Sequence, residues 1–316
     1  MKYKISKDYN KWRLDKFLAE MLPKTTRSQI KKKIQSGLVL VNKKKPTVHE
    51  FVKTGDKIEV KEEKVKKAVK KVKKVFTKDH SKELFKQIKI IDDQPDFLII
   101  NKPANLLVHP TETSEEKTLV DWLVKNFPKL KKVGEDPARP AIIHRLDKET
   151  SGLMVIPKNQ EMFDYLKSQF KTRLVFKKYF ALVYGQLENK EDEIGFRIGR
   201  SSTKGSMAAH PFNSKMGKEA LTRYEVIKEY TKFSLLDINP KTGRTHQIRV
   251  HLFAINHPVV GDKLYKSKKY KPAEINRMFL QAYYLKFTDT QNNEMEYQID
   301  LEKKLNEFLI NMERTG

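Results

Sequence analysis

Short apolar runs separated by turn residues follow one another from about Ile88 onwards, and this alternation constrains the fold more than any other feature. The runs FLII, YFALVYG, YEVIKEY and FSLLDINP have the length and residue types of β-strands. One convincing amphipathic helix interrupts them, over residues 159–170, with Asn159 in the N-cap position. Many strands with few helices predict an α+β body built on a mostly antiparallel mixed sheet.

Residues 1–60 have a different pattern. Apolar residues from Leu14 to Leu22 recur at helical spacing, and a second helix is expected from Thr26 to Gly37, a favourable C-terminal residue. The runs LVLVN and KIEV, at 38–42 and 57–60, are typical of strands. These signals predict a small helix–helix–strand unit, separate from the larger body.

Between the two lies a segment that is rich in lysine. Residues 61–80 contain nine lysines and neither glycine nor proline. We interpret 61–86 as a linker, either helical in part or mobile, and 87–316 as the main body. The linker either adds affinity for a polyanionic partner or only separates the two domains.

The charge is uneven along the chain. Lys and Arg total 65 against 40 Asp and Glu, a net charge of +25, and residues 1–86 hold 27 basic and 10 acidic residues. A basic module of this kind indicates a polyanionic partner. Arg27, Lys31 and Lys32 lie off the apolar Ile30/Ile34 stripe, so we expect them to contact phosphate groups rather than only water.

Several classes of protein are disfavoured by what the sequence lacks. The absence of cysteine rules out disulfides and thiolate zinc sites and is typical of a reducing compartment. The charged start has no signal-peptide pattern and no apolar run is long enough to cross a membrane, so we expect a soluble, cytoplasmic protein. Neither a GxxxxGK[ST] nor a GxGxxG motif is present, so no nucleotide cofactor is expected.

Asp147 is an isolated acid in the cationic stretch HRLDK, between runs at 141–143 and 151–156 that both look like strands. Loops at strand ends commonly carry chemistry. The alternative is a surface turn in which Asp147 pairs with Arg145 or Lys148, which would contribute little to stability.

A second cluster, KTGRTHQIRVHL, favours the functional interpretation of Asp147. If it is a strand, Thr245, Gln247 and Arg249 alternate along one of its faces. An arginine among apolar residues is costly unless an acid meets it, and Asp147 is the best candidate. We therefore expect Asp147 and Arg249 to form a partly buried pair.

Other kinds of site are less well supported. His246 and His251 would lie on opposite faces of a strand and have no cysteine or carboxylate set to complete a metal site, so none is expected. Ser151 does not lie in a GxSxG turn, which disfavours a hydrolase triad. Glu149 is too close to Asp147 in sequence to form a convincing glycosidase pair.

The chain resembles the RluA/RluD-type ribosomal RNA pseudouridine synthases. The resemblance rests on HRLDKETSGLMVIPKN and GRTHQIRVHL, supported by FLIINKPANLLVHP, KKYFALVYG, IGRSSTKGSMA, GKEALTRYEV, HPVVGDKLY and MFLQAYYLKF. It implies a central antiparallel sheet with a cleft across it. The N-terminal unit is similar to the small RNA-binding domain named after the fourth small-subunit ribosomal protein, through RLDKFLAEM, TRSQIKKKIQSGLVLVNKK and VKTGDKIEV.

The resemblance implies isomerisation of uridine to pseudouridine in RNA without a cofactor. By position, Asp147 is the essential carboxylate, Arg249 the cation that keeps it ionised, and Tyr179 the tyrosine that stacks on uracil or helps to remove its C5 proton. For Tyr179 the alternative is an ordinary core aromatic. The target nucleotide must be flipped out of paired RNA, and Arg145 would fill the vacated space or, alternatively, form an ordinary ion pair.

Further RNA contacts are expected from His144, Arg244, Thr245 and Gln247, with a structural role as the alternative for His144. The basic N-terminal module together with this body is the arrangement of the large-subunit ribosomal enzymes, which favours large-subunit ribosomal RNA over transfer RNA as the partner. We expect a monomer. Two departures from the family pattern, Gln281 in place of a histidine and the segment SSTKGS with fewer basic residues, bear on the choice of substrate. An RNA-binding protein with an inactive cleft and a nucleoside hydrolase are the competing hypotheses.

Overall fold

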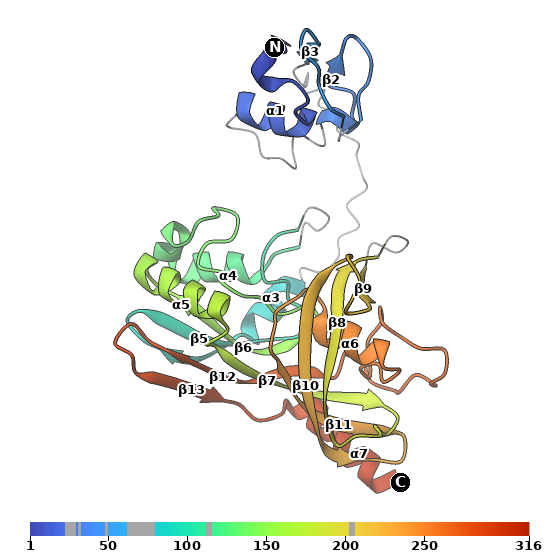
Figure 1. Ribbon diagram of the computed structural model, residues 1–316. Helices are drawn as coiled ribbons and strands as arrows, with labels where there is room; N and C mark the ends of the chain where they lie inside the picture. The colour runs from blue at the N-terminus through green and yellow to red at the C-terminus, as the bar shows by residue number, and fades with distance from the viewer. Residues whose placement is uncertain are drawn as a thin grey trace. The chain divides into compact units, whose positions relative to one another are not determined.

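The computed structural model of the chain describes residues 1–22, 30, 33–47, 50–61, 80–111, 116–201 and 206–315. Contacts divide the chain into two compact units, Met1–Phe76 and Thr77–Gly316. Figure 1 shows the elements of both units. Within the described residues, no helix is long and apolar enough to cross a membrane.

The N-terminal unit is a three-stranded antiparallel sheet with helices packed beside it. Its sheet has the order β1-β3-β2, and its core includes Ile5, Leu14, Leu18 and Ile58. The described elements are β1 (Lys2–Lys4), the 3₁₀ helix η1 (Lys7–Tyr9), α1 (Leu14–Met21), β2 (Val39–Val41) and β3 (Lys57–Val60).

Most expectations for this unit are met where the chain is described. The helix after Arg13 and the two strands lie where the sequence predicts them, and residues 30 and 33–35 are helical. Gly37 has a φ of +75°, the left-handed conformation that favours glycine at a helix end. Strand β1 was not anticipated. The three residues expected to contact phosphate, Arg27, Lys31 and Lys32, lie outside the described residues.

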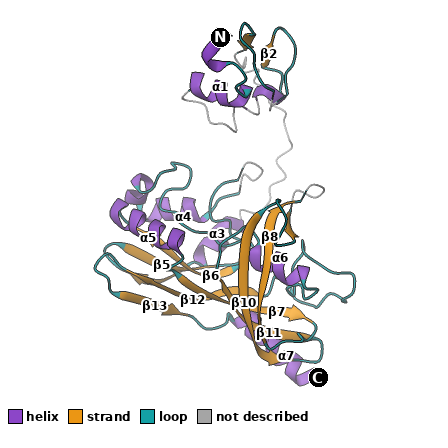
Figure 2. Cartoon of the chain, in the orientation of Figure 1, coloured by secondary structure: helices purple, strands orange, loops and turns teal. Residues whose placement is uncertain are grey.

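The C-terminal unit has the α+β architecture that the sequence predicts (Figure 2). Its strands are β4 (Lys89–Asp93), β5 (Phe97–Lys102), β6 (Ser151–Pro157), β7 (Phe176–Tyr184), β8 (Glu191–Arg200), β9 (Met207–His210), β10 (Lys218–Glu229), β11 (Phe233–Pro240), β12 (Leu280–Thr288) and β13 (Glu294–Gln298). Its helices are α3 (His80–Lys86), α4 (Leu119–Asn126), η2 (Pro128–Lys132), α5 (Gln160–Thr172), α6 (Gln247–Ala254) and α7 (Lys303–Thr315).

One large mixed sheet organises this unit. Among the described residues it has the order β4-β5-β6-β12-β7-β11-β10-β8-β9, with β13 beside β12. Every pair is antiparallel except β6 with β12. Helices α4 and α5 lie by the β5–β6 part of the sheet, and α6 lies by β8 and β10 (Figure 1). The central strands β6, β12, β7 and β11 therefore lie between two groups of helices.

Close packing at the parallel pair depends on one glycine. Gly152 has a φ of +123°, and a Cβ there would lie 2.1 Å from the carbonyl oxygen of Ala282 on β12. No other residue fits such a contact. The glycine therefore lets β12 approach β6 directly after the loop that carries Asp147.

The structure corrects the sequence interpretation in several places. Residues 141–143 are not a strand; Ala141 is fully buried and has a positive φ, so the apolar run fills the core without pairing. The predicted strand through Arg249 is a loop followed by helix α6. Every residue from Gln247 to Leu252 is buried, which removes the one-sided apolar pattern that reveals a surface helix.

Two further helices, α4 and α7, were not expected, and a third, α3, lies at the end of the segment interpreted as a linker that is helical in part or mobile. Residues 80–86, interpreted as the end of the linker, form α3, whose Leu84 and Phe85 pack against the main core. Helix α4 begins with a capping box of Thr118 and Asp121, which the sequence interpretation missed, as it missed α7. The predicted helix at 159–170 is confirmed as α5, where the Asn159 side chain accepts the N–H of Met162 at 2.8 Å.

Candidate active site

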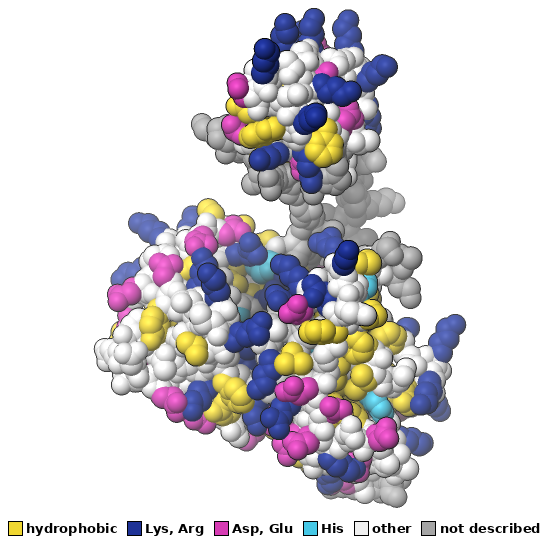
Figure 3. Space-filling view, viewed as in Figure 1, with side chains coloured by type: hydrophobic (Ala, Val, Ile, Leu, Met, Phe, Trp, Pro, Cys, Tyr) yellow, Lys and Arg dark blue, Asp and Glu magenta, His cyan; other side chains and the backbone are white. Residues whose placement is uncertain are grey.

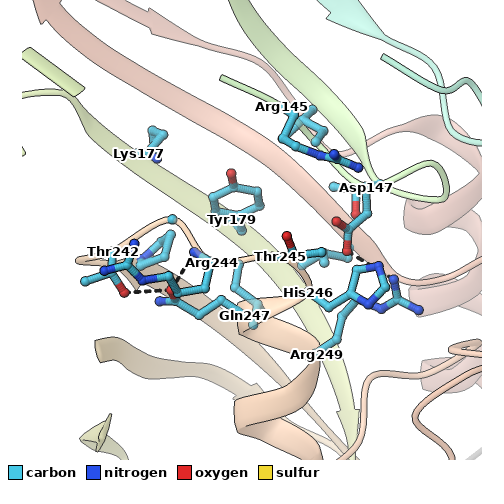
Figure 4. Close-up of a pocket in the computed structure, with 16 residues that line it drawn as sticks. Arg145, Asp147, Lys177, Tyr179, Thr242, Arg244, Thr245, His246, Gln247 and Arg249 are labelled. Carbon is cyan, nitrogen blue, oxygen red and sulfur yellow. Dashed lines mark hydrogen bonds and ion pairs between the residues drawn. The ribbon is translucent and has the colours of Figure 1, made fainter. Parts of the chain in front are cut away.

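A hollow of about 100 Å³ lies over the central strands of the sheet, and we call it the Asp147 hollow. Four parts of the chain meet there: the loop before β6, strand β7, the segment from the end of β11 into α6, and the start of β12 (Figure 4). Its lining includes Arg145, Asp147, Lys177, Tyr179, Thr242, Arg244, Thr245, His246, Gln247, Arg249 and Leu280. Seven of the predicted site residues are thus brought together from segments distant in sequence, and His144 is the exception among those described.

Asp147 and Arg249 form the ion pair expected from the sequence. Nη1 of Arg249 donates to Oδ2 of Asp147 at 3.0 Å. The Asp147 side chain is 14% exposed and the Arg249 side chain is 4% exposed. The pair lies at the edge of the hollow, so the carboxylate is sheltered yet open to a substrate (Figure 4). Its second oxygen makes no hydrogen bond to any residue in the described ranges.

Asp262 is a second partner of Arg249 that the sequence interpretation missed. Nε and Nη2 of Arg249 donate to its two oxygens at 2.6 and 2.9 Å, a bidentate pair. Oδ1 of Asp262 also accepts the N–H groups of Leu264 and Tyr265. The available signal was an acid directly after the apolar run HPVVG, in a segment that carried the resemblance. Asp262 fixes the guanidinium so that its remaining edge faces Asp147.

The two carboxylates also set the charge of Arg249. Burial lowers the pKa of the guanidinium, but the hydrogen bonds and charge of Asp262, followed by those of Asp147, outweigh burial and raise the pKa above its ordinary value. The ring of Tyr265 lies 5.2 Å from the guanidinium carbon, where it adds a cation–π contact. Arg249 is therefore a permanent cation beside Asp147.

Tyr179 lies on β7 with its ring on the wall of the hollow (Figure 4). The residue is 8% exposed, and its hydroxyl makes no hydrogen bond within the part of the chain that is described. Burial, with a smaller contribution from the charge of Asp147, raises the pKa of the phenol. The phenol therefore keeps its proton at neutral pH and presents a ring face and a free hydroxyl to the hollow.

The loop before α6 is held by Gln247. Its Oε1 accepts from Thr242 Oγ1 at 2.6 Å and from the Arg244 N–H at 3.0 Å. Its Nε2 donates to Leu221 O and Thr222 Oγ1. The amide is fully engaged, so Gln247 shapes the hollow and is not positioned to bind phosphate. Thr245, which is exposed, and Arg244, whose Nε donates to Glu219 O, remain available to RNA.

Arg145 and His144 are adjacent in sequence, but only the Arg145 side chain lines the hollow, whereas His144 packs against Phe170. Arg145 is exposed above Asp147, and its Nη1 lies 3.1 Å from Nε2 of His109. His144 instead accepts the N–H of Val155 at Nε2, at 3.1 Å, and stacks on Phe170 with a ring separation of 4.7 Å. His144 does not line the hollow; its described contacts are with Val155 and Phe170.

Lys102 contacts the loop that carries Asp147 through a hydrogen bond to the Lys148 carbonyl. The sequence interpretation gave this lysine no role. It is fully buried, and its Nζ donates to the carbonyl oxygens of Pro103, Leu106 and Lys148 at 3.0, 2.9 and 3.4 Å. Burial lowers its pKa to about 7, and the charge of Asp147 opposes that shift. The motif NKP, quoted for the resemblance, contained the only sequence signal.

Gln281, the residue that the sequence interpretation singled out as a departure from the family pattern, does not reach the hollow. It is fully buried, donates from Nε2 to Asp300 O at 2.8 Å and accepts the Glu302 N–H at 2.8 Å. The neighbouring Leu280 lines the hollow, so Gln281 projects from the other side of β12. This departure from the family pattern therefore concerns packing, whereas part of the SSTKGS segment, 202–205, lies outside the described residues.

A second hollow of about 610 Å³ adjoins the first. Arg145, Asp147, His246 and Arg249 line both, and the second is completed by residues such as Lys148, Lys263, Asn276 and Arg277. Lys and Arg side chains also gather along the middle of the visible face of this unit (Figure 3). Among the described residues, no three His, Asp or Glu side chains are grouped so as to hold a metal ion. Glu149 and Asp262 also line the second hollow, and Glu149 lies 3.8 Å from Nη1 of Arg249. The first hollow, with Asp147 as its only acid, is the more cationic of the two.

Comparison with known proteins agrees with this geometry. The RNA pseudouridylate synthase family matches residues 96–254, and the S4 domain matches residues 12–58. A ribosomal large subunit pseudouridine synthase D of Blochmanniella floridana is 36% identical over 261 residues, which cover 81% of this chain and 76% of the relative. An uncharacterized RNA pseudouridine synthase of Bacillus subtilis is 30% identical over 316 residues, covering 98% and 97%.

A solved structure gives the same result. Human RNA pseudouridylate synthase domain containing 1 superposes with a TM-score of 0.58 at 28% identity, covering 71% of this chain and 88% of that protein. The family match includes Asp147, Tyr179 and Arg249. This chain belongs to the RNA pseudouridylate synthase family and carries an N-terminal S4 domain.

Proposed function

We propose that this pseudouridine synthase isomerises uridine in large-subunit ribosomal RNA, using Asp147 and no cofactor. The observation that carries the proposal is the carboxylate of Asp147, which is open to a hollow that Tyr179 also lines and accepts a hydrogen bond from Arg249. The relatives named large subunit pseudouridine synthase D, which share about a third of their residues with this chain, support the choice of RNA.

Each of the three residues has a role that its surroundings support. Asp147 is the group that reacts while the N1–C1′ bond of uridine breaks and a C5–C1′ bond forms. Arg249 places a positive charge beside it and fixes its position. Because the Tyr179 phenol keeps its proton, we assign the ring a stacking role on uracil rather than removal of the C5 proton.

The remaining contacts concern how RNA enters. A uridine in paired RNA must leave its stack to reach Asp147, at a cost of a few kcal/mol. Arg145 is exposed directly above Asp147, and its planar guanidinium suits the space that the base vacates. Arg244 and Thr245 are proposed to contact the RNA backbone at the other rim of the hollow.

The N-terminal unit is proposed to supply general RNA affinity. Its lysines and arginines, with Arg27, Lys31 and Lys32 among them, suit a phosphate backbone, and many described ones lie on the visible surface of the unit (Figure 3). We propose residues 1–60 as the RNA-binding domain, a lysine-rich linker that ends before α3, and a catalytic domain beyond it. We further propose a monomer that works in the cytoplasm, where ribosomal RNA is found.

The test is to incubate unmodified ribosomal RNA with the protein and to map pseudouridine by chemical labelling. Labelling at defined positions with no change in RNA mass is expected, because isomerisation conserves every atom. A loss of mass at the same positions would identify a nucleoside hydrolase. Tight binding without labelling of any ribosomal or transfer RNA would leave an RNA-binding protein with an inactive cleft.

A further inference from the structure

Lys177 is positioned on the wall of the Asp147 hollow but has no role in the reaction described above. It precedes Tyr179 by two residues on β7, so both side chains project from the same face of the strand. Nδ2 of Asn239 donates to the Lys177 carbonyl at 2.7 Å, just beyond the last pair of the β7–β11 ladder. The backbone at Lys177 is therefore fixed, and its side chain is presented to the hollow (Figure 4).

The Lys177 ammonium has no carboxylate within ion-pair distance among the residues that the structure describes. It lies over the Phe170 ring, with 5.3 Å between Nζ and the ring centroid. The adjacent Lys178, on the opposite face, pairs with Asp237 at 2.6 Å. Burial lowers the pKa of Lys177 to about 8. A partly buried cation without a counter-ion is unfavourable until an anion arrives.

The charge of the hollow also favours an incoming anion. Every residue that lines the hollow is described, and Asp147 is the only acid among them; it pairs with Arg249, whose charge is shared with Asp262. Three further cations line the same hollow: Arg145, Lys177 and Arg244. The wall therefore has an excess of positive charge, and Lys177 is the cation nearest in sequence to the ring proposed to stack on uracil.

The spacing along β7 suits one nucleotide. Two residues of a strand span about 6.6 Å, so Lys177 and Tyr179 present a cation and a ring face at that separation. In a nucleotide, the ribose separates the base from its phosphate by a comparable span. We propose that Lys177 binds a phosphate group of the flipped nucleotide while its base lies against Tyr179. This inference rests on the proposed function, which it extends to the group that positions the target nucleotide.

The experiment uses the full-length protein and a short synthetic RNA that carries a uridine mapped as modified. Lys177→Met should raise KM about tenfold or more, because a hydrogen bond to a charged group is removed, and should affect kcat less. The salt dependence of RNA binding should fall by roughly 0.7–0.9 in log–log slope, the value for one phosphate. Lys177→Arg should recover part of the affinity. Lys304→Met, which removes the charge of an exposed lysine on α7, should change none of these values.

Replacing single phosphates of the RNA by uncharged methylphosphonates identifies the phosphate that Lys177 binds. With wild-type protein, neutralising one of the two phosphates that flank the target should weaken binding about tenfold. With Lys177→Met, that same replacement should have little further effect, which is the coupling expected of two groups that touch. This RNA series remains informative on wild-type protein even if Lys177→Met fails to fold.

Two results would overturn the inference. One is an unchanged KM in a folded Lys177→Met protein; the other is additive effects of the substitution and of each methylphosphonate, which would make Lys177 a packing partner of Phe170. Both presuppose that wild-type protein forms pseudouridine in the RNA. If it forms none, the proposed function itself has failed, and the two failures are thus distinguishable.

Discussion

Arg249 joins Asp147, 102 positions earlier in the chain, through a hydrogen bond of 3.0 Å, while its other edge is held by Asp262. The carboxylate comes from the loop before β6 and the guanidinium from the first turn of α6. Asp262 therefore fixes the orientation of the Arg249 guanidinium through two hydrogen bonds. The position of the reactive carboxylate depends on this three-residue arrangement.

Replacing Arg249 should impair both stability and catalysis. Arg249→Met leaves the buried carboxylate of Asp262 and the partly buried carboxylate of Asp147 without their cation, so the free energy of unfolding should fall by about 3–5 kcal/mol. In protein that still folds, kcat should fall about 10²–10³-fold, as when one fixed donor is removed from an active site. Urea denaturation and single-turnover kinetics measure the two effects.

Arg249→Lys is the matched control. It keeps the positive charge, but one ammonium group cannot donate along two edges to Asp147 and Asp262 as the guanidinium does. We expect stability between those of wild type and Arg249→Met, with kcat still reduced. Wild-type kcat in the lysine variant would show that charge alone suffices and that the bidentate pairing with Asp262 has no positioning role.

The stability of the protein should depend on pH through His144. Burial, and then the charge of Lys177, lower its pKa to about 3 from an ordinary value of 6.5. Between these values the unfolded chain binds a proton that the folded protein does not. The contribution that neutral His144 makes to the free energy of unfolding is therefore fully present above pH 6.5. It is lost as the pH falls from 6.5 towards 3.

His144→Gln tests this assignment, because glutamine retains an acceptor for the Val155 N–H but does not titrate. The free energy of unfolding, measured by urea denaturation from pH 7 to 4, should fall less steeply in the variant than in wild type. His251, whose pKa burial lowers to about 4, should supply part of the slope that remains. Identical slopes in the two proteins would mean that folding does not shift the pKa of His144.

Removing the N-terminal unit should weaken RNA binding without unfolding the rest. Each unit has its own hydrophobic core, so a chain that begins at Thr77 should retain its cooperative unfolding. The log–log slope of binding against salt should fall by roughly 0.7–0.9 for every phosphate that the shortened protein no longer binds. Filter binding over a range of salt concentrations measures it. An unchanged slope would mean that the basic unit does not touch RNA.

Sequence reasoning was most successful where one residue type had one physical explanation. An arginine among apolar residues required an acid, and Asp147 was correctly chosen as its partner. The helix at α5 was found because its apolar residues face one side and Asn159 caps it. These features are local or follow from charge balance, so the sequence contains them.

The sequence could not reveal features that depend on burial from all sides. Helix α6 was mistaken for a strand because the residues of its first turns are all buried, which erases the helical period. Asp262 and Lys102 were missed because each acts through another residue: one braces Arg249 and the other holds carbonyls of the Asp147 loop. Only the folded chain brings these groups together.

The decisive measurement compares wild type with Asp147→Asn, which removes the charge of the carboxylate while keeping its size and an acceptor for Arg249. Both proteins are incubated in excess with unmodified ribosomal RNA, and pseudouridine is quantified by chemical labelling after equal times. We expect defined uridines to be converted by wild type and none by Asp147→Asn, with both proteins binding the RNA equally well. Equal labelling by the two proteins would contradict a catalytic role for Asp147.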